Sequence, residues 1–233
     1  MSEQNFFRKL WLRIWPMKSS GVIAEQLRHP RGKLGKIVAD KLNETNAHLY
    51  DFTFDTMEIE DGEHILELGF GNGKFFKKLL NSAKDLRVTG IDFSHLMVTT
   101  ARRENEDYID AGELEIVYST SHALPFYADQ FDKIFSINVV YFWDDPAESL
   151  REIYRVLKPG GKFYTSIRLK DTMVHFPYTK HGFTLYDEDS WKTLVSKFRF
   201  KYLSGTKLTE PDLEIEGAKF QMESICMVAI KPL

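Results

Sequence analysis

The stretch that decides the fold is His64-Ile65-Leu66-Glu67-Leu68-Gly69-Phe70-Gly71-Asn72-Gly73-Lys74. An apolar run leads into Gly-x-Gly-x-Gly, and apolar residues then follow at helical spacing at Phe75, Phe76, Leu79 and Leu80. The pattern predicts a buried strand, a tight turn and a helix. Glycines allow φ > 0 in such a turn and let backbone N–H groups approach a ligand. We therefore expect a ligand site here, rather than a Gly-rich turn that binds nothing.

The spacing of the glycines separates this turn from two other nucleotide-binding turns. A dinucleotide site requires G-x-G-x-x-G, but Gly73 comes one residue early and Lys74 stands where that pattern has its third glycine. A P-loop requires G-x-x-x-x-G-K-[ST], which residues 69–75 do not supply. The carboxylate of Glu67 would repel a phosphate, so the pattern favours a cationic or hydroxyl-bearing ligand.

A second short strand is expected over residues 87–92, and it ends in Asp92, 19 positions after Gly73. A carboxylate at this place in a βαβ unit can accept hydrogen bonds from both hydroxyls of a ribose. The alternative is an aspartate that caps a helix or a turn. Phe93 and Met97 offer apolar area on which an adenine can rest, although Met97 suits a core position equally well.

The residues 66–73, Leu-Glu-Leu-Gly-x-Gly-x-Gly, resemble motif I of the class I S-adenosylmethionine-dependent methyltransferases. The resemblance spans roughly residues 48–168 and is strongest to the small-molecule "type 11" group, which includes the quinone-biosynthesis C-methyltransferases. It implies an α/β, Rossmann-like fold with helices on both faces of a mostly parallel seven-stranded sheet in the order 3-2-1-4-5-7-6. Two closing strands, expected over 199–209 and 223–231 with a Pro- and Glu-rich loop between them, fit this topology better than that of a dehydrogenase.

The resemblance implies S-adenosylmethionine as cofactor, S-adenosylhomocysteine as product and a small organic methyl acceptor. Residues 119–126 are similar to the family's adenine-reading segment, with Thr120 where the family often has Asp. Asn138, at the end of the fourth strand, is similar to the residue that contacts the methionyl part. The implied cofactor-binding residues are Glu67, Gly69, Gly71, Gly73, Asp92, Phe93, Met97, Thr120, Ser121 and Asn138.

The acceptor is expected between the aromatic run Tyr141-Phe142-Trp143, the segment 168–183 and the N-terminal region. Aromatic faces attract a sulfonium and stack on a flat or apolar molecule, and Tyr141, Phe142 and Arg168 are the predicted substrate residues. The alternative is that the aromatic side chains only pack in the core. The candidates for a proton acceptor are Tyr141, His122, His175 and His181, and the pattern assigns the role to none of them.

Composition limits the possible functions. The 233 residues are 43% hydrophobic and 28% charged, as is ordinary for a globular protein, and the net charge of -3 gives no bulk attraction to nucleic acid. The chain has one cysteine, Cys226, in an apolar run, which predicts a buried strand residue and fits a reducing cytoplasm. Neither C-x-x-C nor H-E-x-x-H occurs, so we expect no metal site.

Residues 1–36 are expected to form an N-terminal segment, and residues 37–233 the methyltransferase domain. Within residues 1–20, one helical face is apolar and cations punctuate it, but the stretch is too short and too charged to span a membrane. We expect it to act as a lid or in dimer packing, with contact to a membrane surface as the alternative. Residues 21–36 read as a loop-rich, basic connector. The oligomeric state is left open.

Three other functions are weighed. A nicotinamide-dependent dehydrogenase shares the strand-turn-helix start but requires the third glycine at another place. A non-catalytic cofactor-binding protein would keep the Gly-rich turn without delivering a methyl group. A nucleic-acid methyltransferase is disfavoured by the acidic balance and because residues 138–141, Asn-Val-Val-Tyr, differ from the Asn/Asp-Pro-Pro-Tyr/Phe pattern.

Overall fold

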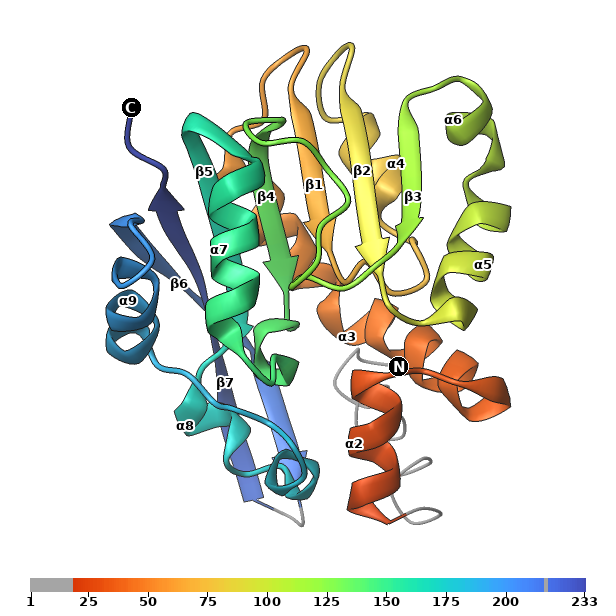
Figure 1. Ribbon diagram of the computed structural model, residues 1–233. Coiled ribbons are helices and arrows are strands. Elements are labelled where there is room, and N and C mark those ends of the chain that lie inside the picture. The colour runs from red at the N-terminus through yellow and green to blue at the C-terminus, as the bar shows by residue number, and fades with distance from the viewer. Residues whose placement is uncertain (1–18, 216–217) are drawn as a thin grey trace.

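The computed structural model describes residues 19–215 and 218–233, which contain a seven-stranded sheet (Figure 1). The strands lie in the order β3-β2-β1-β4-β5-β7-β6, which confirms the order that the resemblance implied. Neighbouring strands are parallel except for β7, which is antiparallel to both β5 and β6. The strands are β1 His64–Leu68, β2 Arg87–Asp92, β3 Leu114–Tyr118, β4 Phe131–Ile137, β5 Leu157–Arg168, β6 Lys201–Ile215 and β7 Ala218–Ile230.

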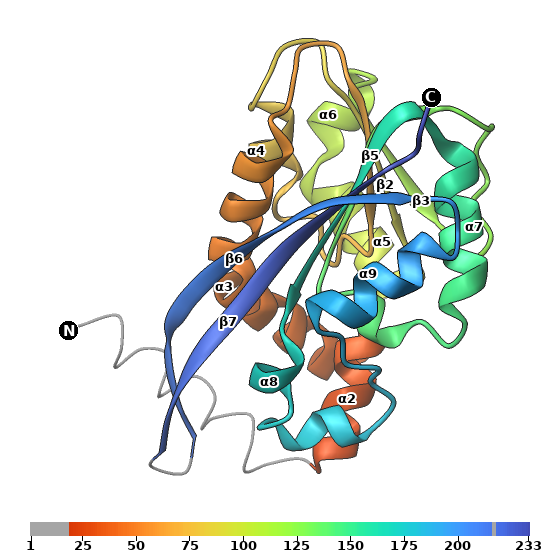
Figure 2. The same cartoon turned by 90° about the vertical axis from the view of Figure 1, so that its left-hand side faces the viewer.

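Helices cover both faces of the sheet (Figure 2). One face packs against α3 (Gly32–Met57), α4 (Phe76–Leu80) and α5 (His95–Glu104) in one apolar cluster. The other packs against α7 (Pro146–Val156) and α9 (Glu188–Ser196) in a second cluster. The short α6 (Glu106–Asp110) follows α5. A sheet between two helical layers has no solvated face, so its strands must be apolar on both sides.

The alternation of side chains along β4 distributes the core between the two layers. Ile134 belongs to the cluster on the α7 side, and the next residue, Phe135, belongs to the cluster on the α3 side. Neither side chain is exposed. Successive strand residues point to opposite faces, so the continuous apolar run that predicted a buried strand is explained by packing on both sides.

The loop-rich connector expected over residues 21–36 is wrong, because most of this stretch is helical. Helix α2 spans Ser20–Arg28 and α3 begins at Gly32, so only three residues around Pro30 lie between them. A Cβ on Gly35 would lie 2.7 Å from the carbonyl carbon of Pro30. Gly35 is therefore a close-packing position inside a helix, and not a loop signal.

The proposed division between residues 36 and 37 falls inside α3. Nearly all of the amphipathic stretch, residues 1–18, lies outside the described residues. Within residues 19–215 and 218–233, no helix has the length and apolar character needed to cross a membrane.

The two closing strands are longer than the sequence indicates, because the expected Pro- and Glu-rich loop is largely part of them. The pairing of β6 with β7 shifts in register directly after Glu210, where Pro211 follows. β6 is an edge strand. Proline lacks the N–H that a sheet ladder needs, and an edge strand or a bulge tolerates this loss.

The carboxyl ends of the parallel strands open at one edge of the sheet. Helix α2, α8 (Lys170–Met173) and the 3-10 helix η3 (Pro177–Lys180) lie at that edge (Figure 1). Open α/β sheets bind ligands outside the carboxyl ends of their strands, so the fold places the candidate site between these helices and the sheet.

Candidate functional site

A cavity of about 460 Å³ lies at the carboxyl edge of the sheet. This volume is within the range of small-molecule sites. The ends of β1, β2, β4 and β5 supply its floor, while α2, α3 and the segments 119–122, 141–145 and 173–183 contribute to its walls. The cavity therefore collects residues from most of the length of the chain.

Gly71 and Gly73, both in the β1–α4 turn, have different surroundings, so the lack of a side chain has a different consequence at each. Gly71 lines the cavity with φ +61°, and a Cβ placed there would meet nothing within 4 Å. Gly73 does not line the cavity, and its Cβ would lie 2.7 Å from that of Ala101 on α5. Gly71 thus leaves room for a ligand, whereas the predicted cofactor residue Gly73 lets α5 pack closely. Gly69 lines the cavity as predicted.

Asp92 lies at the end of β2 and faces the cavity with 8% of its surface exposed. Its Oδ2 accepts a hydrogen bond from the backbone N–H of Gly71 at 3.0 Å, and its Oδ1 accepts one from that of Ser94 at 2.8 Å. Burial raises the pKa of Asp92 to about 7, against the lowering effect of these N–H donors. The backbone N–H groups fix the carboxyl group, which keeps acceptor capacity for a further donor.

Ser94 connects this part of the site to the N-terminal helices. Its hydroxyl donates to the backbone oxygen of Pro30 at 2.7 Å, and its Oγ also accepts from the backbone of Met97 as the cap of α5. Pro30, Leu27 and Arg28 line the cavity, and Arg28 forms an ion pair with Asp144 on the opposite rim. Helix α2 therefore covers the cavity and is fastened on both sides.

Glu67 lies behind the wall of the cavity and not on its surface. Only 2% of its surface is exposed, and its Oε1 accepts a hydrogen bond from the Tyr50 hydroxyl at 2.7 Å. Tyr50 does line the cavity, and its ring stacks on Phe75 with the ring centroids 3.7 Å apart. Burial raises the pKa of Glu67 to about 8. The role of Glu67 in this geometry is to hold Tyr50 in place.

The predicted adenine-reading segment forms the β2 and β3 side of the cavity. Thr120, Ser121 and His122 all line it, together with Phe93 and Met97. Ser121 Oγ lies 2.8 Å from Ser149 Oγ on α7, and Thr120 Oγ1 lies 3.3 Å from His122 Nε2. The hydroxyl groups of Thr120 and Ser121 therefore lie at the wall of the cavity, and their role with adenine stays a prediction.

The aromatic run after β4 is a turn of 3-10 helix, η2 (Val140–Phe142), and not the extended loop that the sequence suggests. Asn138, just before it, has φ +56°, which is uncommon for a residue with a side chain. The turn directs Tyr141, Phe142 and Trp143 to the cavity, although Tyr141 and Trp143 also belong to the core cluster. Tyr141 and Trp143 therefore both pack in the core and form part of the cavity wall.

The segment 168–183 contributes a second set of apolar side chains. Met173, Tyr178 and Phe183 line the cavity, and Phe183 packs against Phe142 with ring centroids 4.7 Å apart. Arg168 also lines the cavity, at the end of β5. This end of the cavity is the most aromatic, as expected for the place where an apolar molecule binds.

The four candidate proton acceptors are not equivalent. His175 and His181 do not line the cavity, and His181 Nε2 lies 2.9 Å from Ser20 Oγ on α2. Burial raises the pKa of Tyr141 well above its usual value, and its hydroxyl donates to the backbone oxygen of Arg168 at 2.7 Å. Tyr141 is therefore a hydrogen-bond donor here. His122 lines the cavity and is exposed.

Several cavity residues on α3 were not predicted from the sequence. Ala39, Leu42, Asn43, Asn46 and Tyr50 all line the cavity. They follow the i, i+3, i+4 spacing of one helix face. Asn43 and Asn46 interrupt an otherwise apolar helix face in the sequence. This pattern could have indicated a site, because a buried polar side chain needs a hydrogen-bond partner.

Comparison with known proteins agrees with this geometry. Residues 66–165 match the family described as "Methyltransferase domain". The uncharacterized methyltransferase YdaC of Bacillus subtilis is 33% identical over 187 residues, which are 80% of this chain and 93% of that protein. The chain belongs to the class I S-adenosylmethionine-dependent methyltransferases.

Two further comparisons place this methyltransferase more broadly. The ubiquinone/menaquinone biosynthesis C-methyltransferase UbiE of Paracoccus denitrificans is 30% identical over 159 residues, with 62% of each chain covered. A chain of the solved complex between the Haloferax volcanii Trm112 methyltransferase activator and a methyltransferase superposes with a TM-score of 0.71. That match has 22% identity and covers 84% of this chain and 94% of the other, so it demonstrates the shared fold.

The residues of the methyltransferase fit the donor that its family uses. The open space beside Gly71 gives a ligand access to the backbone of the turn. The buried Asp92 carboxyl group offers free lone pairs for hydroxyl donors. Apolar side chains at Phe93 and Met97 lie next to it. A nucleoside with a cationic chain suits this set better than a phosphate does.

Proposed function

We propose that this methyltransferase moves the methyl group of S-adenosylmethionine to a small, apolar or aromatic acceptor. The observation that carries the proposal is the order of side chains along one cavity. Residues 119–122 and Phe93 lie beside β2 and β3, the Asp92 carboxyl group lies at β2, the open turn lies at β1, and the aromatic side chains lie at β4 and β5. The donor and the acceptor can then occupy the same cavity end to end.

The proposed roles of the residues follow from this order. Asp92 would hold the ribose hydroxyls, residues 119–122 and Phe93 the adenine, and Asn138 the methionyl part. When bound, S-adenosylmethionine supplies an already activated methyl group. The chain then has to hold the acceptor in line with that group and to exclude water, and such positioning contributes on the order of 7–11 kcal/mol in favourable cases.

Replacing Asp92 with Ala tests the cofactor part. We expect the affinity for S-adenosylhomocysteine to fall by ~1.5–3 kcal/mol, because hydrogen bonds to the carboxyl group are lost. Calorimetric titration measures the affinity, and adenine serves as a comparison ligand without ribose. A folded Asp92→Ala protein with wild-type affinity for S-adenosylhomocysteine, or with an equal loss for adenine, would remove Asp92 from the proposed ribose site.

Replacing Phe142 with Ala tests the acceptor part, because Phe142 is the half-buried member of the aromatic run. We expect methyl transfer to fall about tenfold or more, since a misplaced acceptor loses near-attack geometry, while S-adenosylhomocysteine affinity stays normal. Labelled S-adenosylmethionine with a cell extract and mass spectrometry provides the readout. Full transfer by a folded variant would place the acceptor elsewhere. Cofactor binding without transfer to any compound by the wild type would favour the non-catalytic alternative.

A further inference from the structure

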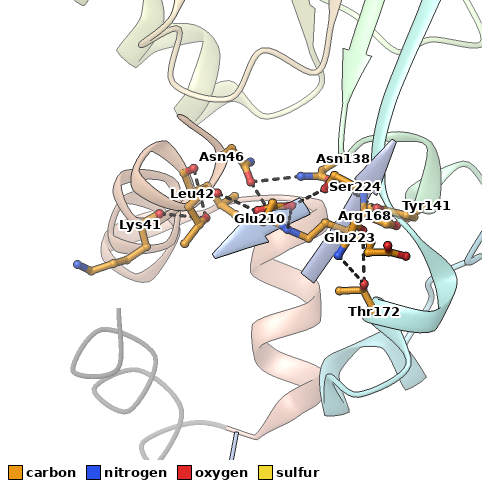
Figure 3. A network of polar contacts seen from close by, with 11 residues as sticks. Lys41, Leu42, Asn46, Asn138, Tyr141, Arg168, Thr172, Glu210, Glu223 and Ser224 are labelled. Atoms are coloured by element: carbon orange, nitrogen blue, oxygen red, sulfur yellow. Dashed lines mark hydrogen bonds and ion pairs between the residues drawn. The ribbon is translucent and has the colours of Figure 1, made fainter. Parts of the chain in front are cut away.

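A buried polar network lies at the β5 end of the cavity, and its central ion pair, Arg168–Glu210, is outside the residues that match the family (Figure 3). Its centre is Arg168, whose side chain is 11% exposed and forms an ion pair with Glu210 of β6 at 2.8 Å. The same guanidinium donates to the backbone oxygen of Thr45 at 2.8 Å and to Asn46 Oδ1 at 3.2 Å. The network thus joins β5, β6 and α3 beneath the cavity.

The network fixes the direction of two amide groups. Asn46 Oδ1 accepts from both Arg168 Nη1 and Asn138 Nδ2, each at 3.2 Å. Asn138 Oδ1 accepts from the backbone N–H of Arg168 at 3.2 Å and lies 3.1 Å from the Tyr141 hydroxyl, which donates mainly to the nearer backbone oxygen of Arg168. Both amide oxygens are therefore used within the network. The donor ends of the two amides are the ends available to a ligand.

Asn46 has spare donor capacity inside the cavity. It lines the cavity and only 8% of its surface is exposed, yet its Nδ2 donates to none of the described residues. Because Asn46 lines the cavity, this amide can donate to an acceptor atom of a ligand there. We call Asn46 Nδ2 and Arg168 Nη1 the donor corner.

The charge of the donor corner is compensated. Glu210 uses both oxygens on Arg168, and Ser224 donates to Glu210 from the other side. The corner therefore offers N–H donors with no net positive charge and no free acceptor from these groups. A neutral carbonyl oxygen suits such a place. An ammonium group does not suit it, because an ammonium only donates, and a hydroxyl would need a further acceptor for its own proton.

The donor corner lies at the acceptor end of the proposed site. Arg168 ends β5 and Asp92 ends β2, and these strands are three positions apart in the sheet. At about 4.8 Å per strand, the separation is roughly 14 Å. The aromatic side chains of Tyr141 and Phe142 line the same end of the cavity.

We propose that the methyl acceptor carries a carbonyl oxygen that binds at the donor corner. This inference rests on the proposed function and narrows its substrate to carbonyl compounds with an apolar or aromatic body. Glu210 is then a positioning residue, because it acts on the acceptor only through Arg168 and Asn46.

The substitution Asn46→Asp tests the inference with little disturbance of the fold. An aspartate keeps the oxygen that accepts from Arg168 and Asn138, and it replaces only the free NH₂ by an oxygen. The probes are acetophenone and α-methylstyrene, which share a shape but differ in the carbonyl group. With S-adenosylhomocysteine saturating, ligand-detected NMR should record about tenfold weaker acetophenone binding in the variant. Binding of α-methylstyrene should change by less than about twofold, because it makes no such hydrogen bond.

Asn43→Asp provides the matched control, because Asn43 lines the same cavity one helical turn away. An equal loss of acetophenone binding in both variants would assign the effect to charge in the cavity and overturn the inference. So would unchanged acetophenone binding in Asn46→Asp, an equal loss for both probes, or no acetophenone binding by the wild type.

A further pair of ligands separates the acceptor from the cofactor. S-Adenosylhomocysteine carries an amino-acid carboxylate, which 5′-methylthioadenosine lacks. If Asn46→Asp lowers the affinity for S-adenosylhomocysteine about tenfold but leaves the affinity for 5′-methylthioadenosine unchanged, the donor corner binds the cofactor's carboxylate and the inference fails. If each nucleoside binds the variant as tightly as it binds the wild type, while acetophenone binds the variant more weakly, the inference is supported. Absence of S-adenosylhomocysteine binding by the wild type overturns the proposed function itself, which is a different result.

Discussion

Replacing Glu210 with Gln is expected to lower the free energy of unfolding by about 3–5 kcal/mol, because it leaves the Arg168 guanidinium buried without its counter-charge. Arg168 and Glu210 are 11% and 5% exposed at their side chains, so solvent cannot compensate. The remaining partners of Arg168 on α3 are neutral oxygens. Urea denaturation of the wild type and the variant, analysed with a common slope, measures the difference.

The pair Lys41–Glu44 on α3 provides the control, because its side chains are 31% and 40% exposed. Glu44→Gln should cost less than about 1 kcal/mol, as is usual for surface ion pairs. The double variant Arg168→Met with Glu210→Leu should recover much of the loss, since an apolar pair carries no desolvated charge. A loss for Glu210→Gln no larger than that for Glu44→Gln would mean that water reaches Arg168.

The sequence predicts the centre of the site because the signals there are local. Gly71 follows the buried strand β1 and Asp92 ends the buried strand β2, and parallel strands bring such ends to the same edge. The hydrogen bond between them needs no information beyond that topology. The strand order itself came from the resemblance, since periodicity gives strands without their neighbours.

Arg168 was a predicted substrate residue, but the partners that form the donor corner around it were not predictable, because they are remote in sequence. Arg168 reaches Glu210, 42 positions later, and Thr45, 123 positions earlier. Glu210 stands beside Pro211 in a segment that reads as a polar loop. Only the register of β6 on β7 buries it. Long-range burial of a charge leaves no periodic signal in a single sequence.

The prediction of a loop-rich connector over residues 21–36 is also wrong because of a contact between residues remote in sequence. Gly21, Pro30 and Gly35 are the residues that usually mark loops. In the structure, Pro30 alone interrupts the helices, and its backbone oxygen accepts from Ser94, 64 positions away. A tertiary contact thus fixes a turn whose flanking residues are helical.

Replacing Glu67 with Gln is expected to make stability less dependent on pH. Burial raises the pKa of Glu67 to about 8 in the folded protein, from an ordinary value of 4.5. Below pH 4.5 both states hold the proton. As the pH rises from 4.5 to 8, the unfolded chain ionises while the folded protein keeps its proton, so the free energy of unfolding falls. The total is on the order of 4 kcal/mol, and Gln, which has no proton to lose, removes it.

The difference between variant and wild type isolates Glu67 from the other titrating groups. Asp92, whose pKa burial raises to about 7, gives a fall of the same sign, and His64, whose pKa burial lowers to about 4, gives a rise with pH in the acid range. His64 acts equally in the two proteins, whereas the charge of Asp92 also raises the pKa of Glu67, so part of the measured difference is the coupling between these two carboxyl groups. Gln keeps an oxygen that accepts from Tyr50, so the two proteins should be similarly stable near pH 5 and diverge toward pH 8. Urea denaturation across this range tests the prediction, with exposed Glu115→Gln on β3 expected to follow the wild type. Parallel curves for Glu67→Gln and wild type would show that Glu67 is ionised in the folded protein throughout.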